Sequence, residues 1–267
     1  MPEVAGLGSI AGEDGRLTIL LLGSDARRGL TGERTDAIIV ASVDPGTGKV
    51  SMASLPRDTV NVPIAPGQVF AAPNRINALL QSWELRGVRR GEALRRMAHA
   101  MGYAFGIEID GYVLIGFRGL QRFIDRIGGV EIELDRPLSD PTMHVGKHGL
   151  DLPAGRSTLD GRLALAFART RHSDSDYQRA ARQQLLIAAT ARRVLELGPE
   201  ALPALAGFVL DQVETDLPLD ALPVLAQLAE RARWGGVKGA VLGPSRFAGP
   251  GAETYTIELR IDAVRAF

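Results

Sequence analysis

Four arginines, two aspartates and a histidine crowd the short segment RTRHSDSDYQRAARQQ, which begins at Arg169. Ser175 or Asp176 is suited to cap a helix that starts near Tyr177. The backbone dipole is positive at that end of a helix, so several guanidinium groups there repel one another unless an anion is present. Free backbone N–H groups and planar guanidinium forks bind phosphate oxygens well. The segment therefore predicts a site for a phosphate or pyrophosphate group.

A structural interpretation of the same segment competes with this prediction. Asp174 and Asp176 would pair with the arginines in a salt-bridge network and leave no binding role for them. The residue types alone favour neither interpretation.

The first quarter of the chain adds acidic residues at the ends of three predicted strands. Asp25 lies just after the apolar run LTILLLG, and Asp36 opens the next run. The third run is followed, after one proline, by Arg57 and Asp58. Ligands of open α/β sheets bind at such strand ends. A single charged turn is most simply a surface loop, but three in one short region favour a ligand site.

The elements that must position these residues alternate along the chain, strand with helix. This alternation predicts an α/β fold, a single domain with a central, mostly mixed β-sheet flanked by helices. Residues 1–16 are expected to form a flexible N-terminal segment and residues 17–267 the domain. Strands are predicted over residues 17–23, 36–43, 49–55, 112–117, 130–134, 237–242 and 254–261. Helices are predicted over residues 77–105, 118–129, 159–170 and 175–198, and a loop over residues 137–153.

Composition excludes several classes of protein. The 267 residues carry 31 basic and 31 acidic side chains, so no overall positive field is available to hold nucleic acid. The absence of cysteine excludes disulfides, zinc–thiolate sites and thiol nucleophiles. The longest apolar run is far too short to cross a bilayer, and the N-terminal residues do not have the pattern of a signal peptide.

Several motifs follow one another at consistent distances: GSDAR, RTDAIIVASVDPGTGKVSMASLPRDT, RINALLQ, GIEIDGYVLIGFRGLQRFIDRIGGVEIEL and GLDLPAGRSTLDGRLALAFARTRHSDSDYQRAARQQ. In this order they resemble the LytR-CpsA-Psr (LCP) family of cell-wall glycopolymer transferases. The resemblance is strong from about Leu17 to Leu197 and weaker beyond it.

The resemblance implies a Mg²⁺-dependent phosphotransferase. Such enzymes move a phosphorylated glycopolymer from a polyprenyl-pyrophosphate lipid carrier to a peptidoglycan hydroxyl. It implies that Mg²⁺ is held by Asp25 and Asp36. The residues that it assigns to catalysis are Asp25, Arg57, Asp58, Arg169 and Arg171. Those that it assigns to substrate binding are Arg75, Arg179 and Gln183, and the position of the charged residues adds Arg27 and Arg182. The general base stays open between Asp25 and Asp58, and a metal-bound Asp25 would be a weak base.

The resemblance also implies a place at the extracytoplasmic face of the cell membrane. Family members usually have an N-terminal transmembrane helix, which these residues do not contain. Membrane association is therefore expected to come from a segment outside this chain.

Three other functions compete with transfer. A polyprenyl-(pyro)phosphate binding protein would keep the arginines without catalysis, but the presence of Asp25 and Asp36 argues against it. A pyrophosphatase would use water as the acceptor, and products formed with and without peptidoglycan fragments would distinguish the two reactions. A transcriptional regulator is disfavoured by the neutral charge and by the lack of a basic recognition helix.

Overall fold

The computed structural model describes residues 6, 10–25, 33–145, 149–171, 175–218, 221–244, 246–251 and 255–266. The chain groups into two compact units. Unit 1 contains Met1–Leu114 and Glu214–Phe267, and unit 2 contains Ile115–Val213. Each unit has a buried apolar core of its own.

Unit 1 is built on a six-stranded sheet with the order β12-β7-β1-β2-β3-β13. Its strands are β1 (Leu17–Ser24), β2 (Thr35–Val43), β3 (Val50–Ser54), β7 (Gly111–Gly116), β12 (Val213–Thr215) and β13 (Val237–Val241). β1, β2 and β3 pair antiparallel, whereas β13 pairs with β3 in parallel. The predicted α/β class with a mixed central sheet is therefore confirmed.

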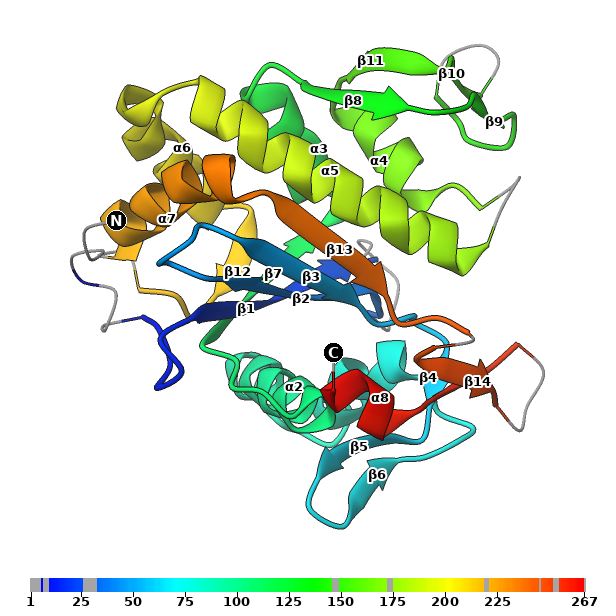
Figure 1. Cartoon of the computed structure of the whole chain (residues 1–267). Helices are drawn as coiled ribbons and strands as arrows, with labels where there is room; N and C mark the ends of the chain where they lie inside the picture. The colour runs from blue at the N-terminus through cyan, green and yellow to red at the C-terminus, as the bar shows by residue number, and fades with distance from the viewer. Residues whose placement is uncertain are drawn as a thin grey trace. The chain divides into compact units, whose positions relative to one another are not determined.

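The alternation of side chains along β1 determines which helices cover the sheet in unit 1. Leu20 and Leu22 pack in the large core with Met97 and Met101 of α2 (Arg90–Phe105). Leu17 packs in a second cluster with α7 (Leu222–Gly235). Because successive strand residues face opposite sides, helices cover both faces of this sheet, as Figure 1 shows.

Smaller elements complete unit 1. They are β4 (Thr59–Val60), β5 (Val62–Ala65), β6 (Gln68–Phe70), η2 (Ile76–Ala78), α1 (Leu79–Glu84), β14 (Ala248–Pro250), β15 (Ile257–Leu259) and α8 (Ile261–Arg265).

Unit 2 is mainly helical. Its helices are α3 (Phe117–Arg126), α4 (Gly161–Arg169), α5 (Asp176–Glu196), η3 (Pro199–Ala201) and α6 (Leu202–Leu210). Two antiparallel ribbons accompany them, β8 (Val130–Leu134) with β11 (Gly155–Leu159), and β9 (Leu138–Asp140) with β10 (Leu150–Leu152). Ile132, Phe167 and Leu186 bring β8, α4 and α5 into one core.

Two predictions of secondary structure are corrected. The helix predicted over residues 77–105 is interrupted between Glu84 and Arg90, where Gly87 has a φ of 84° and ends the helical path. The loop predicted over residues 137–153 contains the β9–β10 ribbon. In the described residues, no helix combines the length and apolar character that a membrane crossing requires.

Candidate active site

Three strand ends meet at one edge of the sheet in unit 1. β1 ends opposite the start of β2, where Ser24 pairs with Thr35. β3 ends near the same place, where Ser54 pairs with Ile39. The antiparallel order thus brings Asp25, Asp36 and the turn after β3 to one edge, as the spacing of the acidic residues in the sequence suggested.

A β-bulge sets the position of Asp36. Gly23 pairs with Ala37 and Ser24 pairs with Thr35, so Asp36 is the extra residue on β2. A Cβ at Gly23 would lie 2.9 Å from the Cβ of Ala37, which explains why glycine is required there. Asp25 lies next to the bulge, because its N–H donates to Arg34 O at 3.1 Å and its Oδ1 accepts from Arg34 N–H at 2.8 Å.

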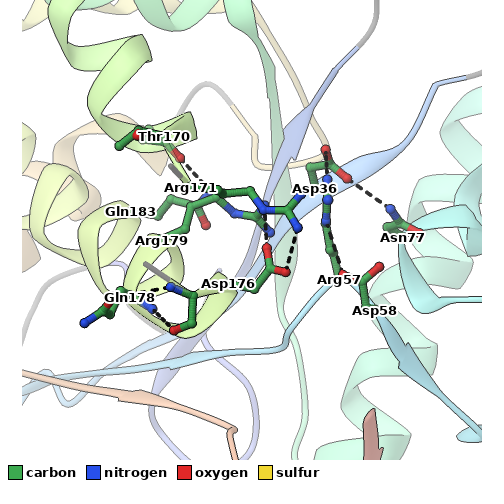
Figure 2. Close-up of polar contacts among 12 residues, drawn as sticks. Asp36, Arg57, Asp58, Asn77, Thr170, Arg171, Asp176, Gln178, Arg179 and Gln183 are labelled. Atoms are coloured by element: carbon green, nitrogen blue, oxygen red, sulfur yellow. Dashed lines mark hydrogen bonds and ion pairs between the residues drawn. The ribbon is translucent and has the colours of Figure 1, made fainter. Parts of the chain in front are cut away.

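Asp36 is the centre of a polar cluster in unit 1. Its Oδ2 accepts from Arg57 Nη1 at 2.8 Å, and its Oδ1 accepts from Asn77 Nδ2 at 3.0 Å (Figure 2). Asp58 accepts from Arg75 Nη1 at 2.6 Å and lies 3.5 Å from Arg57 Nε. The Asp58 side chain is only 9% exposed, so it lies beneath the two guanidinium groups.

A tight turn fixes the direction of Arg57 and Asp58. Thr59 N–H donates to Pro56 O at 3.1 Å, and the Thr59 hydroxyl donates to the same oxygen at 2.6 Å. Asn77 N–H donates to Arg57 O at 3.3 Å and joins the turn to η2. The two charged side chains therefore extend from a backbone that is hydrogen-bonded on both sides.

Asp25 and Asp36 fit the ligand set that a Mg²⁺ ion requires. They are hard oxygen donors, one directly after β1 and one at the start of the neighbouring β2. Within the described ranges, no group of three His, Asp or Glu side chains converges as metal ligands. Mg²⁺ usually keeps several water molecules and binds phosphate oxygens in addition to one or two carboxylates.

A second polar cluster lies at the start of α5 in unit 2. Ser175 caps the helix: its hydroxyl accepts from Gln178 N–H at 3.4 Å, and the Gln178 side chain accepts from Ser175 N–H at 3.3 Å. The predicted cap and helix start are confirmed. Asp176 then contacts Arg179 Nη1 at 2.6 Å and Arg171 Nη2 at 3.1 Å (Figure 2).

Arg182 and Gln183 hold the C-terminal end of α4. Arg182 donates to Phe167 O at 3.1 Å and to Thr170 O at 2.5 Å, and Gln183 donates to Ala168 O at 3.2 Å. These carbonyls have no partner within the helix, so the two side chains replace water there. The contacts tie α5 to α4.

The other two predicted arginines of this region differ in their surroundings. The Arg169 guanidinium lies 4.5 Å from the centre of the Phe117 ring, within the range of a cation–π contact. Arg171 is far more exposed than Arg179. Arg27 and Asp174 lie outside the described residues.

Comparison with known proteins decides the family. The LytR_cpsA_psr family model matches residues 7–238. The chain belongs to the LytR_cpsA_psr family. The fold agrees, because the crystal structure of TagV from B. subtilis superposes with a TM-score of 0.70 at 24% identity, covering 94% of this chain and 94% of that chain.

Two relatives of this LytR_cpsA_psr chain are named "Polyisoprenyl-teichoic acid--peptidoglycan teichoic acid transferase TagU". The one from Oceanobacillus iheyensis is 33% identical over 80% of this chain and 62% of its own length. The one from Enterococcus faecalis is 31% identical over 83% of this chain and 68% of its own length. The chain thus spans less than two thirds of the first of these relatives.

Two residues of the site, Asn77 and Arg34, were missed in the sequence. Asn77 belongs to the RIN motif, of which only Arg75 was assigned, yet its amide holds Asp36 directly. Arg34 is the first residue of the RTD motif, and its backbone N–H donates to Asp25 Oδ1 at 2.8 Å. Asp176 was predicted as a possible cap or as a partner of the arginines, and its pairing with Arg171 and Arg179 confirms the second prediction.

Proposed function

We propose that this chain is a Mg²⁺-dependent phosphotransferase. It takes a phosphorylated glycopolymer from a polyprenyl-pyrophosphate lipid and attaches it to a hydroxyl group of peptidoglycan. The names of the two TagU relatives support a glycopolymer as cargo and peptidoglycan as acceptor. The lipid carrier, the metal and a place on the extracytoplasmic side of the membrane are part of the proposal.

The convergence on Asp36 carries this proposal. Residues from three separate motifs, RTD, PRD and RIN, meet in one hydrogen-bonded cluster of unit 1. The cluster contains two arginines and the two carboxylates Asp36 and Asp58, so its charges are balanced before a metal or phosphate binds. A doubly charged cation next to Asp36 and Asp25 would therefore favour the binding of a diphosphate anion.

The reaction that we propose is a displacement at phosphorus. The acceptor oxygen forms a bond to the phosphorus that carries the glycan, and the P–O bond to the lipid-linked phosphate breaks. The lipid monophosphate leaves with the electron pair, and the acceptor proton passes to a base. Phosphoryl transfer depends mainly on positioning and on neutralising the non-bridging oxygens. In this role Arg57 and Arg75 bind those oxygens, a task that the family resemblance assigns to Arg171 as well, and Asp25 and Asp36 would hold the Mg²⁺ that adds positive charge there.

Each of the two candidates for the base has a second role: Asp58 is paired with arginines, and Asp25, as a Mg²⁺ ligand, would be a weak base. Both oxygens of Asp58 lie against guanidinium groups, at 2.6 Å from Arg75 and 3.5 Å from Arg57. Asp58 is thus arranged to orient the arginines. Asp25 is less enclosed, and its contact within the described residues is the Arg34 N–H.

A reconstituted transfer assay tests the proposal. A synthetic polyprenyl-pyrophosphate glycan, Mg²⁺ and peptidoglycan fragments would be incubated with the protein, and polyprenyl phosphate and glycan-bearing peptidoglycan would be quantified. Wild type should form both products in equal amounts, and Asp36→Asn and Arg57→Ala should lower the rate by about a hundredfold or more.

The matched control for these variants is Arg156→Gln, which removes an exposed arginine that pairs loosely with Glu131 and Glu133. It should transfer at the wild-type rate. Release of lipid phosphate without any glycan on peptidoglycan would instead establish a pyrophosphatase. Tight lipid binding without turnover would establish a binding protein.

A further inference from the structure

Arg90 forms ion pairs with Glu33, Glu84 and Glu214, and these four residues are called the arginine hub. Every N–H donor of the Arg90 guanidinium group is used in it. Arg90 Nε and Nη2 donate to the carboxylate of Glu214, each at 2.8 Å. Nη1 and Nη2 donate to Glu33 at 2.5 and 2.9 Å, and Nη1 also donates to Glu84 at 2.8 Å. A guanidinium group has five N–H donors, and these five contacts account for all of them.

The hub connects α2, which begins at Arg90, to three other segments of unit 1. Arg90 is the first residue of α2, where the helix dipole disfavours a cation. Three carboxylates compensate for that position, and they come from the end of α1, from β12 and from the segment before β2. Burial acts to raise the pKa of Glu33, but hydrogen bonds from Arg90 and Ser24 outweigh it and lower the pKa, so Glu33 stays ionised.

Glu33 connects the hub to the strand ends that carry Asp25 and Asp36. The Ser24 hydroxyl donates to Glu33 Oε1. Ser24 is fully buried, is the last residue of β1 and immediately precedes Asp25. Glu33 itself lies three residues before Asp36. The Glu33 carboxylate therefore binds Ser24, the residue before Asp25. Glu33 itself belongs to the segment that leads to Asp36.

We propose that Arg90, acting through Glu33 and Ser24, is a positioning residue that sets the spacing of Asp25 and Asp36 for a divalent cation. The inference rests on the proposed metal role of these two aspartates. Partners outside the ligand shell that fix ligand orientation typically change metal affinity by about 10- to 100-fold when they are removed.

The test uses the whole chain, with Mn²⁺ as the probe, and two readouts. Binding of Mn²⁺ is measured by electron paramagnetic resonance, and hydrogen exchange is measured at the Asp25 N–H, which donates to Arg34 O. Arg90→Lys keeps the charge but cannot reproduce five directed donors. Ser24→Ala cuts the connection to β1 and leaves the contacts of Arg90 intact.

Both variants should bind Mn²⁺ about 10- to 100-fold more weakly than wild type, and their Asp25 amide should exchange about tenfold faster. Arg96→Lys is the matched control, because Arg96 also lies on α2 and pairs with an exposed carboxylate, Glu92, at 2.9 Å. It should match wild type in both measurements.

The outcomes separate this inference from the proposed function. Wild-type affinity and exchange in Ser24→Ala, or in a folded Arg90→Lys, overturn the positioning role while the metal site stands. If Arg90→Lys does not fold, Ser24→Ala decides. If wild type binds no Mn²⁺, the metal part of the proposed function fails, and the exchange rate of the Asp25 amide alone decides whether the hub fixes this strand end.

Discussion

Asp176 Oδ1 lies 2.6 Å from Arg179 Nη1, and the two residues are one turn apart at the start of α5. The Arg179 side chain is only 7% exposed, so this contact is largely shielded from water. The second oxygen of Asp176 reaches Arg171, whose side chain is 45% exposed. A carboxylate of the protein therefore holds two guanidinium groups that the sequence assigned to phosphate binding.

Replacing Asp176 should strengthen anion binding. In Asp176→Asn the side chain keeps its size but no longer neutralises Arg171 and Arg179, so the positive charge available to a ligand increases by one. The affinity for inorganic pyrophosphate should rise by roughly 1 kcal/mol, or about fivefold, and should fall more steeply with salt than in wild type. Isothermal titration calorimetry at two salt concentrations measures both effects.

The control for this variant lies on the same helix. Arg193 Nη1 and Glu196 form another contact with a spacing of three residues, at 3.3 Å, near the end of α5. Glu196→Gln should leave pyrophosphate affinity unchanged. Weaker binding in Asp176→Asn would show that Asp176 orients the arginines and does not compete with the ligand.

The arginines of this region should separate into two groups by their effect on stability. Arg182 is buried and donates to two carbonyls at the end of α4. Arg182→Met leaves both oxygens without these donors and should lower the free energy of unfolding by about 1–3 kcal/mol. Arg171→Ala should change that free energy by less than about 0.5 kcal/mol but reduce transfer by about a hundredfold or more.

Urea denaturation and the transfer assay would be applied to both variants. The expected result is that the stability loss belongs to Arg182→Met and the selective activity loss to Arg171→Ala. Equal stability losses in the two variants would contradict the division.

The sequence could predict those features that depend on local pattern. The run LTILLLG is a strand because it is apolar throughout, and the cap at Ser175 follows from its side-chain oxygen at the start of a helical pattern. The residues of the PRD and RTD motifs were found because they follow or open such strands. The interruption near Gly87 was missed, because a single glycine within a helical pattern is often tolerated.

Contacts between distant residues could not be predicted in the same way. Asn77 lies 41 positions after Asp36 in the sequence, and no periodicity of the sequence encodes the hydrogen bond between them. Arg90 is likewise one of several charged residues near the start of α2 in the sequence. Its role as a hub depends on Glu214, which is 124 positions away.

Asn77 should matter for metal binding although it is not an ionisable residue. It is buried, and its Nδ2 donates to Asp36 Oδ1 at 3.0 Å. Asn77→Ala removes this donor and lets the Asp36 carboxylate rotate, so Mn²⁺ affinity should fall by about tenfold or more. Calorimetric titration with Mn²⁺ gives the affinity, and Asn74→Ala, which removes an amide on the surface near Ala71, is the control. An unchanged affinity in Asn77→Ala would mean that Arg57 alone orients Asp36.

The pH dependence of stability should show the contribution of Glu33. Its pKa is lowered from the ordinary value of 4.5: burial opposes the shift, but the hydrogen bonds from Arg90 and Ser24 dominate. A carboxylate with a lowered pKa stabilises the fold above its unfolded value, and this stabilisation is lost as pH falls through the folded value. Between about pH 5 and pH 3, the free energy of unfolding should therefore fall more steeply in wild type than in Glu33→Gln. Parallel curves from urea denaturation would contradict an ionised Glu33 in the hub.

Asp110 should show the opposite dependence in the same experiment. Its pKa is raised from 3.8, first by burial and then by the nearby charges of Glu108 and Asp14. A carboxylate with a raised pKa contributes stability below its unfolded value, and this contribution is lost as pH rises through the folded value. In wild type the Thr18 N–H donates to Asp110 Oδ2 at 2.7 Å, and Asp110→Asn keeps an oxygen that can accept this bond. As pH rises above about 4, the free energy of unfolding of Asp110→Asn should therefore increase relative to that of wild type. Over the same rise, that of Glu33→Gln should decrease relative to wild type. If Asp110→Asn instead lost stability relative to wild type at higher pH, the Thr18 contact would be shown to require the charged carboxylate and to outweigh its burial.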